Sequence, residues 1–311
     1  MILVIGSGSV GSLFGGLVAA KNHNVILFGR KAHVDKINNN SLRIQGLINR
    51  EVKIAAFDKV EKVQQYLLES EKSLEFVLFT TKAHQIERAA KQIQNLILPE
   101  TTIVSIQNGL GTEDILKGIF SKNIVLRVVT SIGVCRPEHG VVDFTGDGKT
   151  LIGYNSSEER IPAERLLSIL KESDVNSFLE DNILGAVFTK TIVNCALNPL
   201  TAIHNVKNFE IYNQKPLREK ATLLAQEAWN VAKKLNVKLT TENPIEYTFE
   251  IIKKTGENYS SMLSDIRNKR KTEIDYINGR IVTLGLEHNI KVVHNQEIYN
   301  EILSLEKSFL E

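Results

Sequence analysis

The sequence predicts an α/β protein in which an N-terminal doubly wound sheet is followed by an all-α C-terminal domain. Two observations lead to this fold class. In the first half, short apolar runs alternate with amphipathic helical patterns, which is typical of βαβ units and a parallel sheet. In the second half, helical periodicity continues almost without a break. A chain of 311 residues is long for one core and fits two domains.

The first half contains four apolar runs of strand length, at residues 2–6, 24–29, 74–80 and 101–107. A helical pattern follows the first run to about Lys21, and another spans 83–97. From about 123 to 154 the apolar runs become shorter and are broken by glycines, which predicts antiparallel edge strands.

The second half predicts five helices, at 183–197, 216–236, 243–255, 273–288 and 294–308. No low-complexity linker separates the two halves. We place the boundary near 175–182, which gives a predicted first domain of residues 1–180 and a second of 181–311.

Composition limits the classes of partner. Lys+Arg 38 against Asp+Glu 36 leaves a net charge of +2, too small to indicate a nucleic-acid surface. The two cysteines, Cys135 and Cys195, lie in apolar runs and suit reduced thiols better than a disulfide framework. The apolar start is too short for a signal peptide, and no stretch approaches the roughly 18 apolar residues of a membrane span. We therefore expect a cytoplasmic protein with no membrane partner.

A glycine-rich loop follows the first strand and opens the first helix. Its sequence fits G-x-G-x-x-G and comprises Gly6, Ser7, Gly8, Ser9, Val10 and Gly11. Gly6 permits the tight turn, Gly8 lets the backbone approach a pyrophosphate, and Gly11 allows close packing of helix on sheet. The alternative is a glycine turn with no ligand. Because the motif opens the first βαβ unit, we predict a dinucleotide site of the Rossmann type.

The residues after the second strand predict NADP(H) as the cofactor. NAD-binding proteins usually place Asp or Glu about 20 residues beyond the glycines, and here no acid precedes Asp35. Arg30 can instead pair with a 2′-phosphate, with Lys31 beside it. The alternative for Arg30 is a solvated loop charge.

Two further loops lie where strands of such a sheet should end, beside the cofactor. The segment 80–85 offers Lys82 and Gln85, and the segment 107–112 offers Asn108. Asn-Gly is also a turn signal, so Asn108 has a structural alternative.

A polar stripe lies on the predicted helix that begins near residue 183. Lys190, Asn194 and Asn198 are spaced i, i+4 and i+8, which puts them on one face of a largely apolar helix. Hydride transfer to a carbonyl requires a proton donor, and Lys190 is a candidate. The asparagines can hydrogen-bond a substrate and stay neutral. The alternative is a solvated helix edge.

The segment 271–279 supplies a candidate carboxylate. Thr272 and Asp275 have the spacing of a capping box, which leaves Glu273 in the first turn and free to point into a site. The alternative for Glu273 is a surface acid that complements the helix dipole. The histidines show no metal-ligand spacing, so no metal is expected.

Five segments occur in the order typical of ketopantoate reductases, and the chain resembles this family from Gly6 to Gly279. They are GSGSVGSLFGG, TTKAHQ, SIQNGLGTED, KTIVNCALNPLTAIHNVKN and SSMLSDIRNKRKTEIDYING. The resemblance implies NADPH-dependent reduction of 2-dehydropantoate to (R)-pantoate, a step toward pantothenate and coenzyme A. Phe188 stands where many members have Trp, and His139 where a Pro is common, which affects packing rather than chemistry.

The resemblance also implies a role for each matching residue. Lys190 is the proton donor, and the substrate-binding positions are Asn108, Asn194, Asn198, Asn208 and Ser261. The positions that contact the cofactor are the glycine loop, Arg30, Lys82, Asn108, Val134 and Glu273. Glu273 completes the ternary site.

Two alternatives to this function stay open. One is an NADP-dependent reductase of another 2-oxo acid, and the other is a noncatalytic NADP(H)-binding sensor. The intact set of polar residues, including Lys190, argues against both. A homodimer is the candidate assembly.

Overall fold

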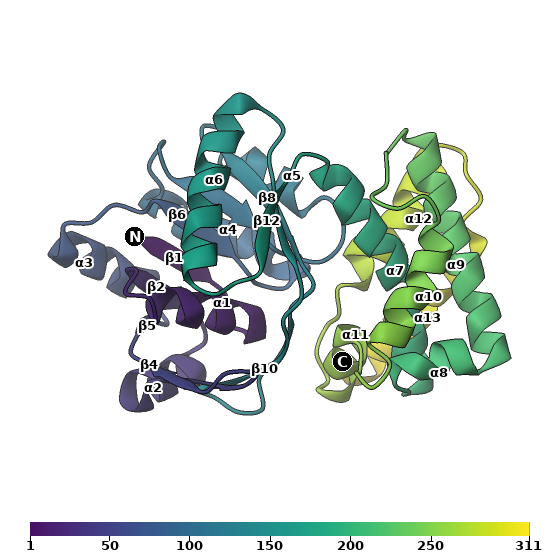
Figure 1. Cartoon of the computed structure of the whole chain (residues 1–311), viewed down its shortest axis with the longest axis horizontal. Helices are drawn as coiled ribbons and strands as arrows, with labels where there is room; N and C mark the ends of the chain where they lie inside the picture. Colours follow the sequence, from purple (N-terminus) through teal and green to yellow (C-terminus); the bar gives the residue numbers. More distant parts are fainter. Residues whose placement is uncertain (311) are drawn as a thin grey trace. The chain divides into compact units, whose positions relative to one another are not determined.

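The strand β1 (Ile2–Ile5) lies inside an eight-stranded sheet of the computed structural model, which describes residues 1–310 (Figure 1). The strand order is β12-β11-β8-β7-β6-β1-β2-β5. The other strands are β2 (Val25–Phe28), β5 (Ala55–Phe57), β6 (Phe76–Phe79), β7 (Thr102–Ser105), β8 (Val125–Thr130), β11 (Thr150–Gly153) and β12 (Ser177–Glu180). All pairs from β5 to β8 are parallel. The parallel-rich α/β fold class that the sequence predicts is confirmed.

The alternation of side chains along β1 explains the layers of this unit. Leu3 and Ile5 pack in a cluster with α3 (Val60–Ser70), α4 (Ile86–Ile93) and α5 (Thr112–Ile119). Ile2 and Val4 pack in a second cluster with α1 (Ser9–Ala19) and α6 (Ser157–Glu172). Because successive side chains of a strand point to opposite faces, a strand that is apolar throughout is covered on both sides.

The chain reverses its direction of travel across the sheet at β1. From β1 it proceeds to β2 and β5 on one side, and it then returns to add β6, β7 and β8 on the other. Ligands of open α/β sheets bind outside the carboxyl ends of the strands at such a switch point. The loops after β1, β6 and β7 carry Gly6, Lys82 and Asn108, three of the predicted site residues.

A second, four-stranded sheet has the order β4-β3-β10-β9. Its strands are β3 (Leu42–Gly46), β4 (Arg50–Val52), β9 (Gly133–Cys135) and β10 (Val141–Gly146). The expectation of antiparallel edge strands after residue 123 is right for β9 with β10 and for β11 with β8. It is wrong for β8, which pairs in parallel with β7, and for β10, which pairs in parallel with β3.

The helical segments of the first half differ in detail from the sequence analysis. The pattern at 83–97 is a 3₁₀ turn η1 (Ala83–Gln85), then α4, then a second 3₁₀ turn η2 (Gln94–Leu96). The sequence predicted no element at α2 (Lys31–Asn40), α3, α5 or α6. The helix α6 begins at a serine cap, since the Ser156 hydroxyl accepts from the backbone N–H of Glu159.

The chain divides into two compact units. The first comprises residues 1–107 and 112–183, and the second comprises 108–111 with the helical segment from Leu184 onward. The short segment 108–111 therefore belongs by its contacts to the helical unit, although its chain neighbours lie in the first. The predicted second domain ends at Glu311, which lies outside the described residues.

The second unit is helical throughout its long segment. Its elements are α7 (Ile183–His204), α8 (Asn208–Asn213), α9 (Lys215–Lys234), α10 (Pro244–Lys254), α11 (Ser261–Arg267), η3 (Ile274–Tyr276), α12 (Asn278–Glu287) and α13 (Val293–Leu310). Three of these elements, α9, α10 and α13, follow the expected positions closely, whereas α8 and α11 are short and were not expected.

The helix α7 continues past Pro199 to His204, although the sequence predicted its end at residue 197. Proline has no N–H for the carbonyl of Cys195, four residues earlier. The side-chain amide of Asn278 donates to that carbonyl at 3.1 Å. A tertiary hydrogen bond thus replaces the missing helical one and lets the helix continue.

The helix α7 is also long and apolar enough to cross a membrane by length and composition, which corrects the expectation that no stretch is. Its most apolar stretch is 83% buried inside the protein. A buried core helix passes the same test, so this is weak evidence for a membrane span.

Candidate functional site

Different physical requirements explain the glycine at each of three positions in the loop after β1. Gly6 has φ +101°, and a Cβ there would lie 2.7 Å from the backbone nitrogen of Thr81. A Cβ on Gly11 would overlap the carbonyl of Gly6 and the hydroxyl of Thr80. Gly8 has φ −76°, and nothing in the protein lies within 4 Å of a Cβ placed on it. The fold therefore explains Gly6 and Gly11, whereas the open space at Gly8 suits the approach of a ligand.

The start of α1 offers backbone amides to an anion. Gly8 is the N-cap, no side chain caps the helix, and the first turn contains no acid. The first N–H groups of a helix need partners from outside the helix, and they favour negative charge. The hydroxyl oxygen of Thr81 is buried, close to Gly6, and has no hydrogen-bond partner within residues 1–310. These features fit the pyrophosphate of a dinucleotide.

The carbonyl of Ser7 is held by two side chains. The Ser12 hydroxyl donates to it at 3.2 Å and the Arg136 guanidinium at 3.3 Å. A Cβ on Gly29 would overlap the Ser7 hydroxyl, so the end of β2 packs directly on the loop. Arg136 was not singled out from the sequence, since nothing near it in the chain indicates this contact.

The structure places Arg30 directly after β2, as the exposed N-cap of α2. Within residues 1–310 no carboxylate forms an ion pair with Arg30, whereas the neighbouring Lys31 binds Asp35 at 2.8 Å. Lys82 is half-buried at the start of η1, after β6. Val134 lies on β9 and packs against the cluster that contains α1. Arg30, Lys82 and Val134 all belong to the first unit, as does the glycine loop.

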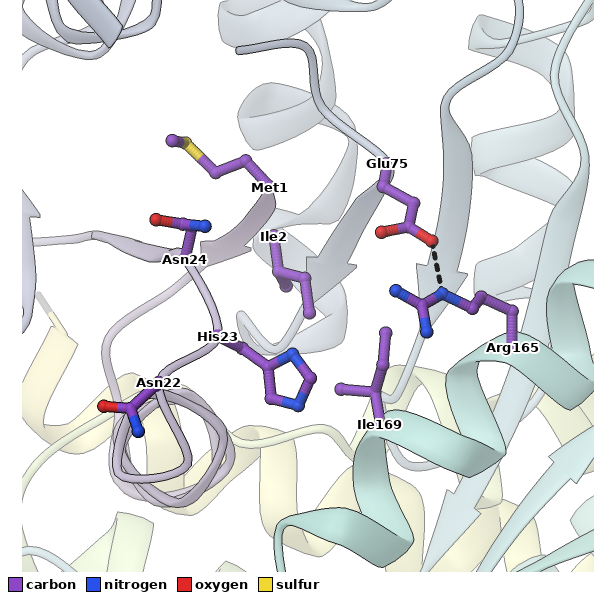
Figure 2. A pocket seen from close by; sticks show the side chains of 8 residues that line it. All are labelled: Met1, Ile2, Asn22, His23, Asn24, Glu75, Arg165 and Ile169. Carbon is purple, nitrogen blue, oxygen red and sulfur yellow. Dashed lines mark hydrogen bonds and ion pairs between the residues drawn. The ribbon is translucent and has the colours of Figure 1, made fainter.

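A pocket of about 150 Å³ lies at the amino ends of strands in the eight-stranded sheet (Figure 2). Ile2 at the start of β1 and Glu75 just before β6 line it. Glu75 forms an ion pair with Arg165 at 2.8 Å, which is the dashed line in Figure 2. Because β1 and β6 are parallel, this pocket is at the amino ends of strands whose carboxyl ends carry Gly6 and Lys82. No predicted site residue lines it.

In the second unit, three predicted residues form a hydrogen-bonded chain. The Lys190 ammonium donates to the Asn108 Oδ1 at 2.8 Å, and the Asn108 Nδ2 donates to the Glu273 Oε2 at 3.0 Å. An ammonium can only donate and a carboxylate can only accept, so the two partners fix the orientation of the amide. Glu273 is 5% exposed, which excludes the alternative of a surface acid.

A buried arginine fixes the two points where the segment 108–111 leaves and rejoins the first unit. The Arg127 guanidinium donates to the Gln107 carbonyl and to the Thr112 hydroxyl, both at 2.6 Å, and to the Ser105 hydroxyl at 2.8 Å. Arg127 lies on β8 and is 7% exposed. A charged residue inside an apolar strand is the sequence signal that could have identified Arg127.

The remaining members of the stripe on α7 are Asn194 and Asn198. Asn198 is 4% exposed and Asn194 is half-buried, so the stripe is not a solvated helix edge. Within residues 1–310 nothing hydrogen-bonds the side-chain amide of either residue. The polar atoms of these two amides are not fully enclosed by protein, so both are available to a polar ligand on one face of α7.

Asn208 and Ser261 lie near the last turns of α7. The Thr201 hydroxyl on α7 donates to the hydroxyl of Ser260, which caps α11 just before Ser261. The Asn208 Nδ2 donates to the Thr255 hydroxyl at 3.0 Å, and the Asn208 Oδ1 is buried with no partner in the described part of the chain. Ser261 is exposed at the start of α11.

The predicted capping box at Thr272 is wrong. The Thr272 N–H donates to the Glu306 carboxylate rather than to Asp275. Asp275 instead accepts from the Tyr299 hydroxyl at 2.8 Å and pairs with Lys271 at 3.0 Å. Burial and the neighbouring Asp275 raise the pKa of Tyr299 to about 12. The expected helix 273–288 is accordingly a 3₁₀ turn followed by α12.

Comparison with known proteins identifies the family of this chain. Residues 2–157 match the family described as ketopantoate reductase PanE/ApbA, and residues 182–306 match its C-terminal counterpart. A 2-dehydropantoate 2-reductase of Pyrococcus abyssi is 32% identical, and the alignment covers 94% of each chain. The enzyme of the same name from Lactococcus lactis is 30% identical over 95% of this chain and 97% of its own.

Two solved structures share the fold over nearly the whole length. A ketopantoate reductase family protein from Ralstonia eutropha has a TM-score of 0.90 at 25% identity, covering 100% of this chain and 99% of its own. A D-mandelate dehydrogenase, in a ternary structure with NADH and anilino(oxo)acetate, has a TM-score of 0.91 at 26% identity with the same coverage. With both halves matched by the family models, this chain belongs to the ketopantoate reductase family of oxidoreductases.

Proposed function

We propose that this protein reduces 2-dehydropantoate to (R)-pantoate with NADPH, as a step toward pantothenate and coenzyme A. The observation that carries the proposal is the series of side-chain hydrogen bonds from Lys190 through Asn108 to Glu273. The amides of Asn194 and Asn198, without partners in residues 1–310, lie on the same face of α7 as Lys190. The names of the relatives from Pyrococcus abyssi and Lactococcus lactis support the substrate.

Lys190 is the proton donor in this proposal. NADPH, when bound, supplies the hydride for the carbonyl carbon of the substrate. The Lys190 ammonium gives a proton to the carbonyl oxygen as negative charge develops there, so that the product is a neutral hydroxyl. The amide of Asn108 accepts from the Lys190 Nζ and holds it in place at 2.8 Å.

The other polar residues of the helical unit bind the substrate. Asn194 and Asn198 can donate to a substrate carboxylate or accept from its hydroxyl, and their amides are uncommitted within the described chain. Asn208 and Ser261 extend this set at the Asn198 end of α7. Orientation of a bound substrate by such groups contributes to the rate as well as to affinity.

In this proposal the first unit binds the phosphates of NADPH, and the helical unit acts on the substrate. The open space at Gly8 and the uncapped start of α1 suit the pyrophosphate, and Arg30 suits the 2′-phosphate. The further cofactor contacts that we propose are Lys82, Asn108, Val134 and Glu273. The NADH in the D-mandelate dehydrogenase structure makes the choice between NADPH and NADH a point to measure.

The reaction is proposed to run in the cytoplasm. Cys195 is a buried free thiol and Cys135 an exposed one, which suits a reducing compartment. Burial raises the pKa of both thiols, so neither is an activated nucleophile.

A second candidate is the reduction of a different 2-oxo acid. It is favoured by the similarity to D-mandelate dehydrogenase, whose bound anilino(oxo)acetate is a 2-oxo acid with a bulky apolar group. The α7 stripe provides hydrogen bonds that any 2-oxo acid could use.

One assay distinguishes the two candidates. NADPH and NADH oxidation would be followed with 2-dehydropantoate, 2-oxoisovalerate, pyruvate and benzoylformate as substrates. We expect the highest kcat/KM for 2-dehydropantoate with NADPH. A higher kcat/KM for benzoylformate would favour the second candidate, and binding of NADPH without turnover of any substrate would favour a sensor.

A further inference from the structure

The glycine loop is connected to the turn between β9 and β10 through a fully buried histidine. His33 lies on α2 and is 0% exposed. One ring nitrogen, Nδ1, accepts from the backbone N–H of Gly140 at 3.0 Å. The other, Nε2, lies 2.9 Å from the hydroxyl of Ser12 on α1.

The partners determine the tautomer of His33. Because Nδ1 accepts from a backbone N–H, the proton of the neutral ring must be on Nε2. Nε2 then donates to the Ser12 hydroxyl, which in turn donates to the Ser7 carbonyl at 3.2 Å. The result is a directed chain of three hydrogen bonds from Gly140 to the middle of the glycine loop.

The surroundings keep this ring neutral. Burial, the Arg136 guanidinium and His139 together lower the pKa of His33 to about 4. The His139 ring centroid lies 5.9 Å from that of His33, on the segment between β9 and β10. Protonation would remove the acceptor for the Gly140 N–H and would place a second positive charge beside Arg136.

We propose that His33 is a positioning residue for dinucleotide binding, acting through Ser12 to hold the Ser7 carbonyl and keep the start of α1 open to phosphate. The inference rests on the proposed function and adds a residue that does not itself touch the cofactor. A loop that is ordered before binding loses less conformational entropy when the ligand arrives, and it therefore binds more tightly.

The test is NADPH affinity, measured by fluorescence titration, for wild type, His33→Phe, His33→Gln and Ser12→Ala. Phe keeps an aromatic ring but no hydrogen bonds, and Gln keeps a donor near the position of Nε2. We expect His33→Phe and Ser12→Ala each to raise the Kd by about 5- to 10-fold, as for the loss of one buried hydrogen bond. The double variant should be no worse than the worse single variant, since both act through one chain. His33→Gln should recover most of the affinity.

His23→Phe provides a matched control. His23 lies in the same unit, and it lines the pocket at the amino ends of the strands, away from the glycine loop. The NADPH Kd of this variant should equal that of wild type.

The pH profile separates positioning from packing. Wild-type affinity should fall as pH drops toward the pKa of His33, and this part of the loss should be missing in His33→Phe. Unchanged NADPH affinity in both folded His33→Phe and Ser12→Ala would overturn the inference alone. A wild-type protein that binds no dinucleotide would overturn the proposed function together with it.

Discussion

The loop after β1 and the polar face of α7 are constructed from opposite kinds of residue. The loop depends on the near absence of side chains, because Gly6 lies against Thr81 and Gly11 against Gly6. The α7 face depends on long polar side chains, since Lys190 reaches Asn108, which is 82 residues away in the chain. Asn108 in turn reaches Glu273, which is 165 residues away.

This difference determines how each region should fail. Added volume should damage the loop, while the loss of one functional group should damage the α7 face. Effects on cofactor affinity and on the chemical step should therefore be separable, and substitutions can test whether they are.

The largest expected effect is on the chemical step. Lys190→Ala should lower kcat by about 10²- to 10⁴-fold, the range typical of general acid catalysis. NADPH affinity should stay close to wild type, because the loop and Arg30 belong to the first unit. Reduction by the wild type should fall as pH rises and the ammonium loses its proton, and this alkaline limb should vanish in the variant.

Lys291→Ala, which removes an exposed lysine of the same unit, is the control and should leave kcat unchanged. If Lys190→Ala reduced the substrate at an undiminished rate and kept the alkaline limb of its pH–rate profile, the α7 face would have no chemical role.

The next effect is on cofactor choice. Arg30→Ala should remove a charge-assisted contact worth about 1.5–3 kcal/mol and so weaken NADPH binding by roughly 10- to 150-fold, with little effect on NADH binding. Lys31→Ala should have a much smaller effect, because Lys31 is already engaged by Asp35. Equal Kd values of the wild type for NADPH and NADH would contradict the assignment of Arg30.

Two glycine substitutions sharpen the comparison within the loop. Gly8→Ala should leave the thermal midpoint nearly unchanged, because its φ suits alanine and its Cβ meets no protein atom. It should weaken NADPH by about tenfold if the pyrophosphate approaches there. Gly11→Ala should instead destabilise the protein by about 1–3 kcal/mol, since its Cβ would overlap the Gly6 carbonyl.

Thermal unfolding and NADPH titration of the same two preparations would check this pair. Loss of stability in Gly8→Ala, or wild-type affinity in that variant, would show that Gly8 serves the fold rather than a ligand.

The same contrast explains what could be predicted from the sequence. The role of Gly6 depends on a local turn, and the spacing of Lys190, Asn194 and Asn198 depends on helix geometry, so both were visible in short windows. The fold class followed from alternating apolar runs for the same reason.

Features that depend on contacts between distant segments were not predictable. The prediction of a capping box at Thr272 was wrong because the Thr272 N–H donates to Glu306, 34 residues later, and not to Asp275. The end of α7 was misplaced because Asn278 satisfies the carbonyl that Pro199 leaves open. His33 has no signal in its own neighbourhood, since both its partners lie elsewhere in the chain.

The smallest expected effect concerns Glu273, the far end of the chain that begins at Lys190. Glu273→Gln keeps an oxygen that can accept from the Asn108 Nδ2, so the amide should keep its orientation toward Lys190. Only the charge is lost, and a hydrogen bond to a charged group is roughly twice as strong as a neutral one. We therefore expect kcat/KM to fall by only about 3- to 10-fold. The kcat/KM of Glu273→Ala should fall further, because this variant leaves the Asn108 amide without this acceptor.

Glu287→Gln, at an exposed position on α12, is the control. Steady-state kinetics with thermal unfolding of all three variants would check the prediction. Wild-type kcat/KM in both Glu273 variants would show that the carboxylate only fills a buried position, and the α7 site would then end at Asn108.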